Sequence, residues 1–154
     1  EEGLNVPQHV MAEVESLSRL QEGLDIVAYL QDMSLQHVAN DLMEGLRRFN
    51  AGDYEGAIKF FRKVVEGWRN LLQKQDFSIP VGEKRREALK DYASKAFHLL
   101  SNFGEHAGTH GSYKEALLSK NIAVELSRYL VSYLLEGQTR EQSQTTEAQK
   151  QAGQ

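Results

Sequence analysis

Histidine and amide side chains gather toward the end of one predicted helix. His98, Asn102 and His106 are spaced four residues apart, so on an α-helix they fall along one side, and His110 follows just beyond. Two or three histidines with a carboxylate such as Glu105 could bind a metal ion, and a histidine beside a polar partner could act as an acid or base. The cluster lacks the His-Glu-x-x-His pattern of zinc proteases, so we expect structural or surface histidines, no metal and no cofactor.

The other common catalytic templates are missing from the sequence. The chain contains no cysteine, which excludes thiol chemistry and disulfides. It contains no Gly-rich phosphate loop of the Walker type, no dinucleotide fingerprint and no Gly-x-Ser-x-Gly elbow. The sequence therefore favours a protein that is not an enzyme, with ribonuclease the only enzyme class that its residues leave open.

Helices must position any site, because apolar residues recur every three to four positions through most of the chain. Pro7 opens a first helical stretch, and Ser34 is the expected N-cap of a second helix that ends near Phe49. Gly52 and Asp53 predict a turn and a cap before a third helix that ends near residue 75. A fourth helix is expected from about residue 83 to residue 103 or 106, and Ser112 is expected to cap a fifth that runs to about residue 136.

We therefore predict an all-α fold, a mainly antiparallel up-and-down bundle of about five helices formed by residues 1–136 as a single domain. Residues 137–154 contain no large apolar side chain and are expected to form a polar tail or a helix extension. Trp68 and the aromatic residues at helical spacing are expected in the core. The same spacing predicts the inward faces of the second, third and fourth helices. The residues concerned include Met43 in the second helix, Phe61 and Trp68 in the third, and Tyr92 and Phe97 in the fourth. Phe60 falls beside the main stripe of its helix.

A pattern in the third helix recurs in the fifth. Gly52-Asp53-Tyr54-x-x-Ala57-Ile58 is echoed 59 residues later by Gly111-Ser112-Tyr113-x-x-Ala116-Leu117, and Arg69 is matched by Arg128. The echo has two explanations, an old duplication of a helical hairpin or two helices that solve one packing problem with the same residues.

The stretch from Gly45 through Phe49, Gly52-Asp53-Tyr54 and Ala57-Ile58 to Phe61 resembles a tetratricopeptide repeat. That resemblance covers about 25 residues and implies a pair of helices that binds a peptide in a groove. The family's period of about 34 residues differs from the 59-residue echo of this chain.

Residues 38–136 also resemble, in layout, the HEPN-type helical bundles that include the C-terminal domains of bacterial abortive-infection proteins. The stretches that carry the resemblance are 52–66, 99–108 and 129–134. Ribonuclease members of that family carry an Arg, a polar residue and a His in one helix, often at a dimer interface. The resemblance implies catalytic roles for Asn102 and His106, but Ser101 stands where the Arg is expected, so the cation would have to come from Arg128 or a partner subunit.

Charge is unevenly spread along the chain. Residues 1–46 hold nine acidic residues and one basic residue, whereas residues 47–95 hold twelve basic and seven acidic residues. The basic segment could meet an anion such as RNA, although charged runs more often solvate helix surfaces. No apolar run approaches the roughly 18–20 residues of a membrane span, so we expect no membrane contact, and the lack of cysteine favours a cytoplasmic protein.

These observations together favour a non-catalytic helical interaction or dimerisation domain, part of a defence or regulatory protein. We expect it to self-associate or bind a protein partner through the fourth or fifth helix and their connecting turn. The alternatives are a HEPN-type RNA-binding or RNA-cleaving domain that uses Asn102 and His106, and a tetratricopeptide-like peptide-binding adaptor.

Overall fold

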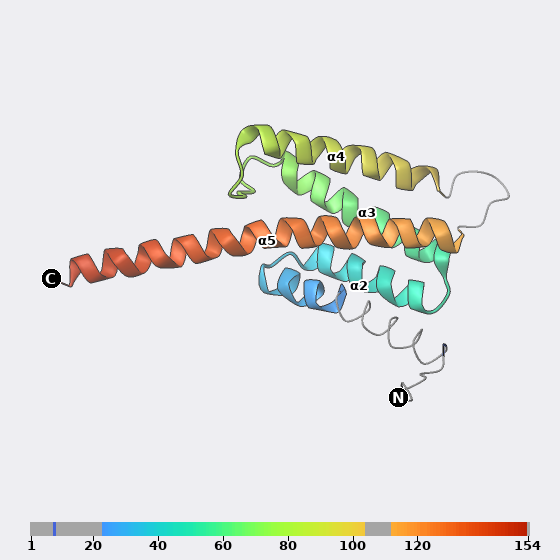
Figure 1. Cartoon of the computed structure of the whole chain (residues 1–154), viewed down its shortest axis with the longest axis horizontal. Coiled ribbons are helices and arrows are strands. Elements are labelled where there is room, and N and C mark those ends of the chain that lie inside the picture. Colours follow the sequence, from blue (N-terminus) through green and yellow to red (C-terminus); the bar gives the residue numbers. More distant parts are fainter. Residues whose placement is uncertain (1–7, 9–22, 104–111, 154) are drawn as a thin grey trace, which may run out of the picture.

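The computed structural model describes residue 8, residues 23–103 and residues 112–153. Within these residues the chain forms the helices α2 (Gln36–Asn50), α3 (Tyr54–Gln73), α4 (Glu83–Asn102) and α5 (Tyr113–Ala152), and residues 23–32 are also helical. This described part contains no strand. Helices that follow one another in sequence run in opposite directions (Figure 1), which confirms the prediction of an all-α bundle.

Side chains at the helix starts explain where α3 and α5 begin. The Asp53 carboxylate accepts the backbone N–H of Gly56 at 3.0 Å, and the Ser112 hydroxyl accepts the backbone N–H of Glu115 at 3.3 Å. Each cap satisfies a donor that a helix start leaves unpaired. Gly52 has a φ of +79°, so the turn before α3 uses the left-handed freedom of glycine, as expected.

The predicted cap of α2 was wrong by one residue. Leu35 occupies the N-cap position and makes no side-chain cap hydrogen bond. Ser34 instead adopts a φ of 61°, in the left-handed region, at the corner between residues 23–32 and α2. The chain reverses at this corner to place Leu30 and Leu35 in the core, and this tertiary demand overrides the capping preference of serine.

Helix α3 lies at the centre of the bundle and packs against α2, α4 and α5. Phe61 and Trp68, both fully buried, point into the core from α3. The Trp68 indole N–H donates to the Ser127 hydroxyl of α5 at 2.9 Å. At the first residues of α3 and α5, the ring centroids of Tyr54 and Tyr113 lie 5.5 Å apart. Helices α3 and α5 therefore run side by side in the same direction (Figure 1).

Helix α4 makes its main contact with α3 alone, which leaves much of its surface open. Its buried residues are Ala93, Ala96 and Leu100, and two of these have small side chains. Tyr92, expected in the core, is 49% exposed, and Met43 of α2 is 43% exposed. Both expectations were wrong because helical spacing identifies a stripe but not how wide a face the neighbouring helices cover.

The junction between α3 and α4 is held by one side chain. The Arg86 guanidinium donates to the carbonyl oxygens of Leu72, Lys74 and Phe77, at distances from 2.6 to 3.2 Å. These carbonyls include orphan acceptors at the end of α3, so Arg86 completes this terminus from the next helix.

Helix α5 continues far beyond the bundle. Residues 138–153 are all exposed, and apart from Ala148, Ala152 and Gly153 they are polar. They project from the bundle as a single helix (Figure 1). Side-chain hydroxyls along this extension, such as those of Thr139 and Ser143, donate to the carbonyl one turn earlier. No helix in the described residues has both the length and the apolar character of a membrane span.

Candidate functional site

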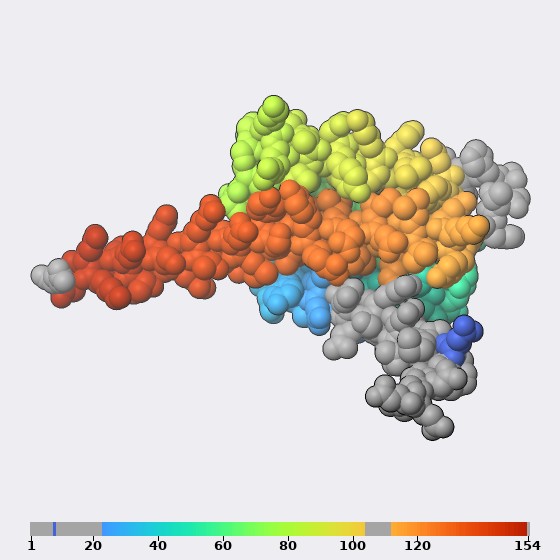
Figure 2. Space-filling view, in the orientation of Figure 1, coloured from blue at the N-terminus to red at the C-terminus, as the bar shows by residue number. Residues whose placement is uncertain are grey.

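Apart from Tyr113 at the start of α5, four of the large apolar side chains that α4 and α5 expose follow the seam between these helices. They are Tyr92 and Leu99 on α4 and Leu118 and Tyr129 on α5, each 41–49% exposed. Figure 2 shows α4 and the first half of α5 next to each other on the side of the molecule turned to the viewer. We call this surface the α4–α5 face and define it by these four residues with Arg85, Ile122 and Tyr133.

One hydrogen bond between described side chains joins α4 to α5 and indicates the register of the α4–α5 face. Arg85, in the first turn of α4, donates to the Tyr133 hydroxyl at 3.0 Å, which joins the start of α4 to the middle of α5. Tyr92 and Leu99 follow Arg85 at intervals of seven residues, so they share its side of α4. Because α5 runs in the opposite direction, the residues before Tyr133 on the same side, Tyr129 among them, lie along the seam.

Two tyrosines form the centre of this hydrogen-bonded group. The hydroxyl oxygens of Tyr129 and Tyr133 lie 3.2 Å apart, and their rings meet edge to face with centroids separated by 5.0 Å. The hydrogen bond with Tyr133 raises the pKa of Tyr129 above its usual value near 10. Tyr129 is therefore protonated at neutral pH and presents an uncharged aromatic surface.

The charges beside the face are engaged within their own helices. Lys95 lies 2.8 Å from Asp91 on α4, and Arg128 lies 2.7 Å from Glu125 on α5. The hydrogen bond with Asp91 raises the pKa of Lys95, so Lys95 stays charged at neutral pH. The face is thus an aromatic and aliphatic surface bordered by locally balanced charges.

Asn102, one of the two sequence-predicted catalytic residues, does not meet Arg128 in the described structure. Asn102 is exposed and is the last residue of α4, while His106 lies outside the described residues. Arg128 lies fifteen residues along α5 from Tyr113, roughly 22 Å at 1.5 Å per residue. It lines a groove of about 400 Å³ with Asp25 and Tyr29, away from the end of α4.

The histidine cluster is only partly described. His98 is exposed on α4, and His110 and Glu105 lie outside the described residues. Ser101 donates its hydroxyl to the Phe97 carbonyl at 2.8 Å, which uses its donor within the helix. Across the described residues, no group of three or more His, Asp or Glu side chains is placed to hold a metal ion.

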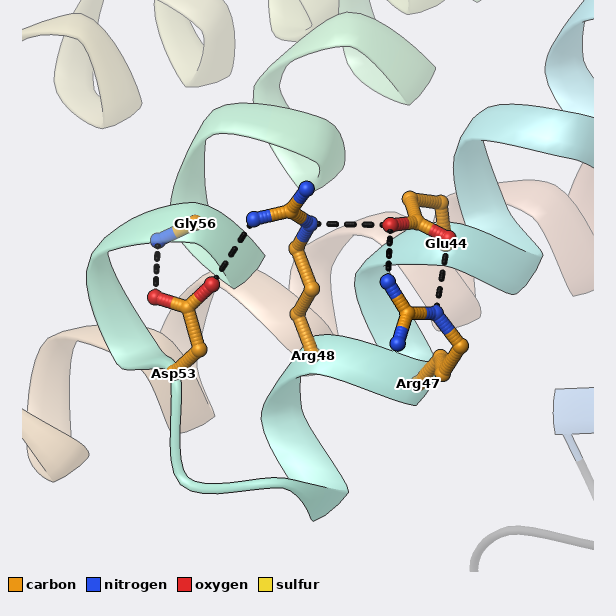
Figure 3. A network of polar contacts seen from close by, with 5 residues as sticks. All are labelled: Glu44, Arg47, Arg48, Asp53 and Gly56. Atoms are coloured by element: carbon orange, nitrogen blue, oxygen red, sulfur yellow. Dashed lines mark hydrogen bonds and ion pairs between the residues drawn. The ribbon is translucent and has the colours of Figure 1, made fainter.

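A network of ion pairs ties the end of α2 to the start of α3 (Figure 3). Glu44 accepts hydrogen bonds from Arg47 and Arg48, and Arg48 also donates to Asp53 at 2.8 Å. The bonds from the two arginines lower the pKa of Glu44 to about 2. Asp53 has a lowered pKa because it accepts the Gly56 N–H and the Arg48 guanidinium.

A side chain at position 56 would displace the side chains of this network. A Cβ atom at Gly56 would lie 2.8 Å from Arg48 Nη1 and closer still to the Asp53 carboxylate. The guanidinium of Arg48 also lies 5.0 Å from the ring centroid of Phe60. The ammonium of Lys63, which like Phe60 belongs to α3, lies 4.8 Å from the same centroid. Phe60, placed beside the main stripe by the sequence, thus supports cations at the surface.

The same arginine borders a cleft of about 410 Å³ between the start of α3 and the last turn of α4. Lys59 and Arg62 of α3 and Leu100 of α4 line it, together with Asp53 and Glu55. Its lining carries three cations and two carboxylates, and one of these carboxylates, that of Asp53, is bonded to Arg48. The cleft adjoins the end of α4 that carries Asn102. Sequence reasoning located the basic segment but not this convergence, which depends on how α2 and α4 flank α3.

Comparison with protein-family models, curated proteins and solved structures finds no match to this chain.

Proposed function

We propose that this chain is a non-catalytic helical interaction domain that self-associates through the α4–α5 face. The observation that carries the proposal is the row of half-exposed apolar side chains, Tyr92 and Leu99 on α4 and Leu118 and Tyr129 on α5. Contiguous exposed apolar surface of this kind marks interaction sites, and tyrosine is enriched at their centres. The HEPN-like layout noted in the sequence is consistent with a domain that works by pairing.

The size of the face suits a second copy of the chain. From Arg85 to Leu99 it extends about 21 Å along α4, and two helices of about 10 Å diameter make it about 20 Å wide. The projected area of about 400 Å² understates the accessible area, so a pair of such faces approaches the lower end of specific interfaces, about 600 Å² per partner. Because Lys95 and Glu125 are already paired with Asp91 and Arg128, these charges add little like-charge repulsion when two identical faces meet, and the Arg85 guanidinium lies at one end of the face.

Light scattering behind size-exclusion chromatography tests the proposal with a matched pair of variants. Tyr92→Glu places a carboxylate in the centre of the face, whereas Met43→Glu places one at a similarly exposed apolar position of α2. We expect the wild type and Met43→Glu to be dimers and Tyr92→Glu to be a monomer, with dimerisation weakened by about 100-fold or more. A wild type that stays monomeric at ~200 µM, or equal effects of the two variants, would refute self-association through this face.

RNA binding is the second candidate function, and the cleft lined by Arg48, Lys59 and Arg62 supports it. Cations that converge from two helices suit a phosphate backbone, and the binding would weaken steeply with salt. We expect Arg62→Gln to lower RNA affinity if this function holds, while Lys150→Gln at the far end of α5 leaves it unchanged. RNA binding that is indifferent to salt and to Arg62→Gln would count against the cleft. A cleaving activity would in addition require His106, and His106→Ala would abolish it.

A further inference from the structure

A cavity lies where α5 leaves the bundle, and neither candidate function uses it. Its volume is about 390 Å³, and three separate segments build it, the corner at residues 33–35, the loop at residues 77–80 and the α5 helix from residue 134 onward. Figure 1 shows both loops beside α5 at the point where the extension begins. We call it the exit cavity. Its volume is at the small end of the range of small-ligand sites, about 300–1,000 Å³.

The floor of the exit cavity is apolar. Leu35 is buried, and Phe77, Pro80 and Leu134 are half-buried around it. Gly137 of α5 faces Pro80, and a Cβ atom there would reach the proline ring at 3.7 Å. The loop that supplies Phe77 is held by Arg86, which donates to the Phe77 carbonyl at 2.6 Å. The floor is therefore formed in advance by packed residues and accepts an aliphatic or aromatic group.

The rim of the exit cavity carries one cation and one anion. Arg140 and Glu141 are consecutive residues of α5, both line the cavity, and neither forms an ion pair with another described residue. A ligand with a carboxylate alone would be attracted by Arg140 and repelled by Glu141, and an ammonium alone would meet the reverse. A molecule that carries both charges close together satisfies both side chains at once.

We propose that the exit cavity binds a free apolar α-amino acid as a zwitterion. The carboxylate pairs with Arg140, the ammonium pairs with Glu141, and the side chain lies on the floor formed by Leu35, Phe77 and Leu134. The ligand bridges the bundle and the first turn of the extension. Because a polar helix without tertiary contacts is only marginally stable, binding also strengthens the helix around residues 138–146.

Titration calorimetry with three related probes tests this assignment. L-leucine carries both charges, N-acetyl-L-leucine lacks the ammonium, and L-leucinamide lacks the carboxylate. We expect L-leucine to bind with a dissociation constant of about 1 mM, which suits a ligand of so few atoms, and each capped analogue to bind about tenfold more weakly. In parallel, amide hydrogen exchange over residues 138–146 should slow when L-leucine is added.

Charge-removing variants assign each contact. Arg140→Gln should bind L-leucine about tenfold more weakly and no longer prefer it to L-leucinamide, and Glu141→Gln should lose the preference over N-acetyl-L-leucine. Lys150→Gln and Glu147→Gln remove the same charges farther along α5, outside the cavity lining, and should bind as the wild type does. No detectable binding at ~10 mM, equal binding of leucine and a capped analogue, or an equal loss in the control variants would overturn the proposal.

Discussion

Replacing Arg86 by methionine should destabilise the bundle more than any exposed charge does. Methionine keeps most of the apolar stem but removes the guanidinium that donates to the carbonyls of Leu72, Lys74 and Phe77. The acceptors on Leu72 and Phe77 are reached by part-buried bonds, whereas the bond to Lys74 is exposed. Water can replace the exposed bond at little cost, so the loss should come mainly from the other two.

The expected magnitude follows from these contacts. Each part-buried carbonyl that loses a charged donor costs about 1 kcal/mol, and removing a cation from the end of α3 costs about 0.5 kcal/mol more. The total of about 2–3 kcal/mol corresponds to a fall in Tm of about 5–10 °C for a chain of this size. Arg86→Lys keeps the charge but not the planar set of donors, so it should lose roughly half as much.

Chemical denaturation of Arg86→Met, Arg86→Lys and Lys84→Met measures these differences. Lys84 is exposed in the same first turn of α4, and its replacement should change the free energy of unfolding by less than about 0.5 kcal/mol. If Arg86→Met and Lys84→Met differ by less than ~0.5 kcal/mol, the guanidinium does not hold the α3–α4 junction and the reasoning fails.

Three further perturbations probe the rest of the bundle. Ser127→Ala should cost about 1–3 kcal/mol in urea denaturation, because it leaves the buried Trp68 indole N–H without its acceptor, and a cost below ~0.5 kcal/mol would contradict that bond. Gly137→Ala should raise the stability by about 0.5–1 kcal/mol, because a Cβ there meets only ordinary van der Waals contact inside a helix, and a lower Tm would show that the site is more crowded. The stability that Glu44 gains from Arg47 and Arg48 should be fully present above pH 4.5 and lost as the pH falls toward 2, because the folded pKa lies below the unfolded value. An NMR titration of the Glu44 carboxyl with a midpoint above ~4 would disprove these ion pairs in solution.

The helices and two of their three expected N-caps could be predicted because their causes are local, whereas Ser34 does not cap α2. Asp53 and Ser112 cap α3 and α5 as expected, and Gly52 supplies the positive φ of the turn. The inward stripe of α3 was also predicted correctly, since α3 contacts three helices and almost its whole apolar stripe is covered. The caps and the turn depend on the few residues around them, whereas the α3 stripe was correct because three helices cover it.

The α4–α5 face could not be predicted because it depends on which helices are neighbours. Tyr92 shares the spacing of the α4 core residues Ala93 and Ala96, yet α4 packs mainly on α3 and leaves Tyr92 open. The network of Glu44, Arg48 and Asp53 likewise joins residues of two helices, and the spacing of charges along the chain does not reveal it.

The full length of α5 could not be predicted from the sequence for a different reason. The lack of apolar residues after residue 136 argued for a polar tail or a helix extension, and the helix runs on to Ala152. Hydrophobic periodicity carries no signal for a helix that buries nothing. Only the helix-forming preference of the Gln, Glu, Arg and Lys residues remains, and that preference is weak.

The 59-residue echo gains a physical meaning from the positions that it relates. Tyr54 contacts its counterpart Tyr113, and Trp68 bonds to its counterpart Ser127, so α3 and α5 lie parallel and in register. Two parallel helices that start at the same end need the same kind of cap and covering ring, and each must be preceded by a helix that returns from the other end, as α2 and α4 do. The pairing of a large Trp68 with a small Ser127 lets the helices approach closely where identical residues would not fit together. The repeated residues therefore reflect the parallel packing of α3 and α5. Trp68 and Ser127, which differ from each other, set the distance between these two helices.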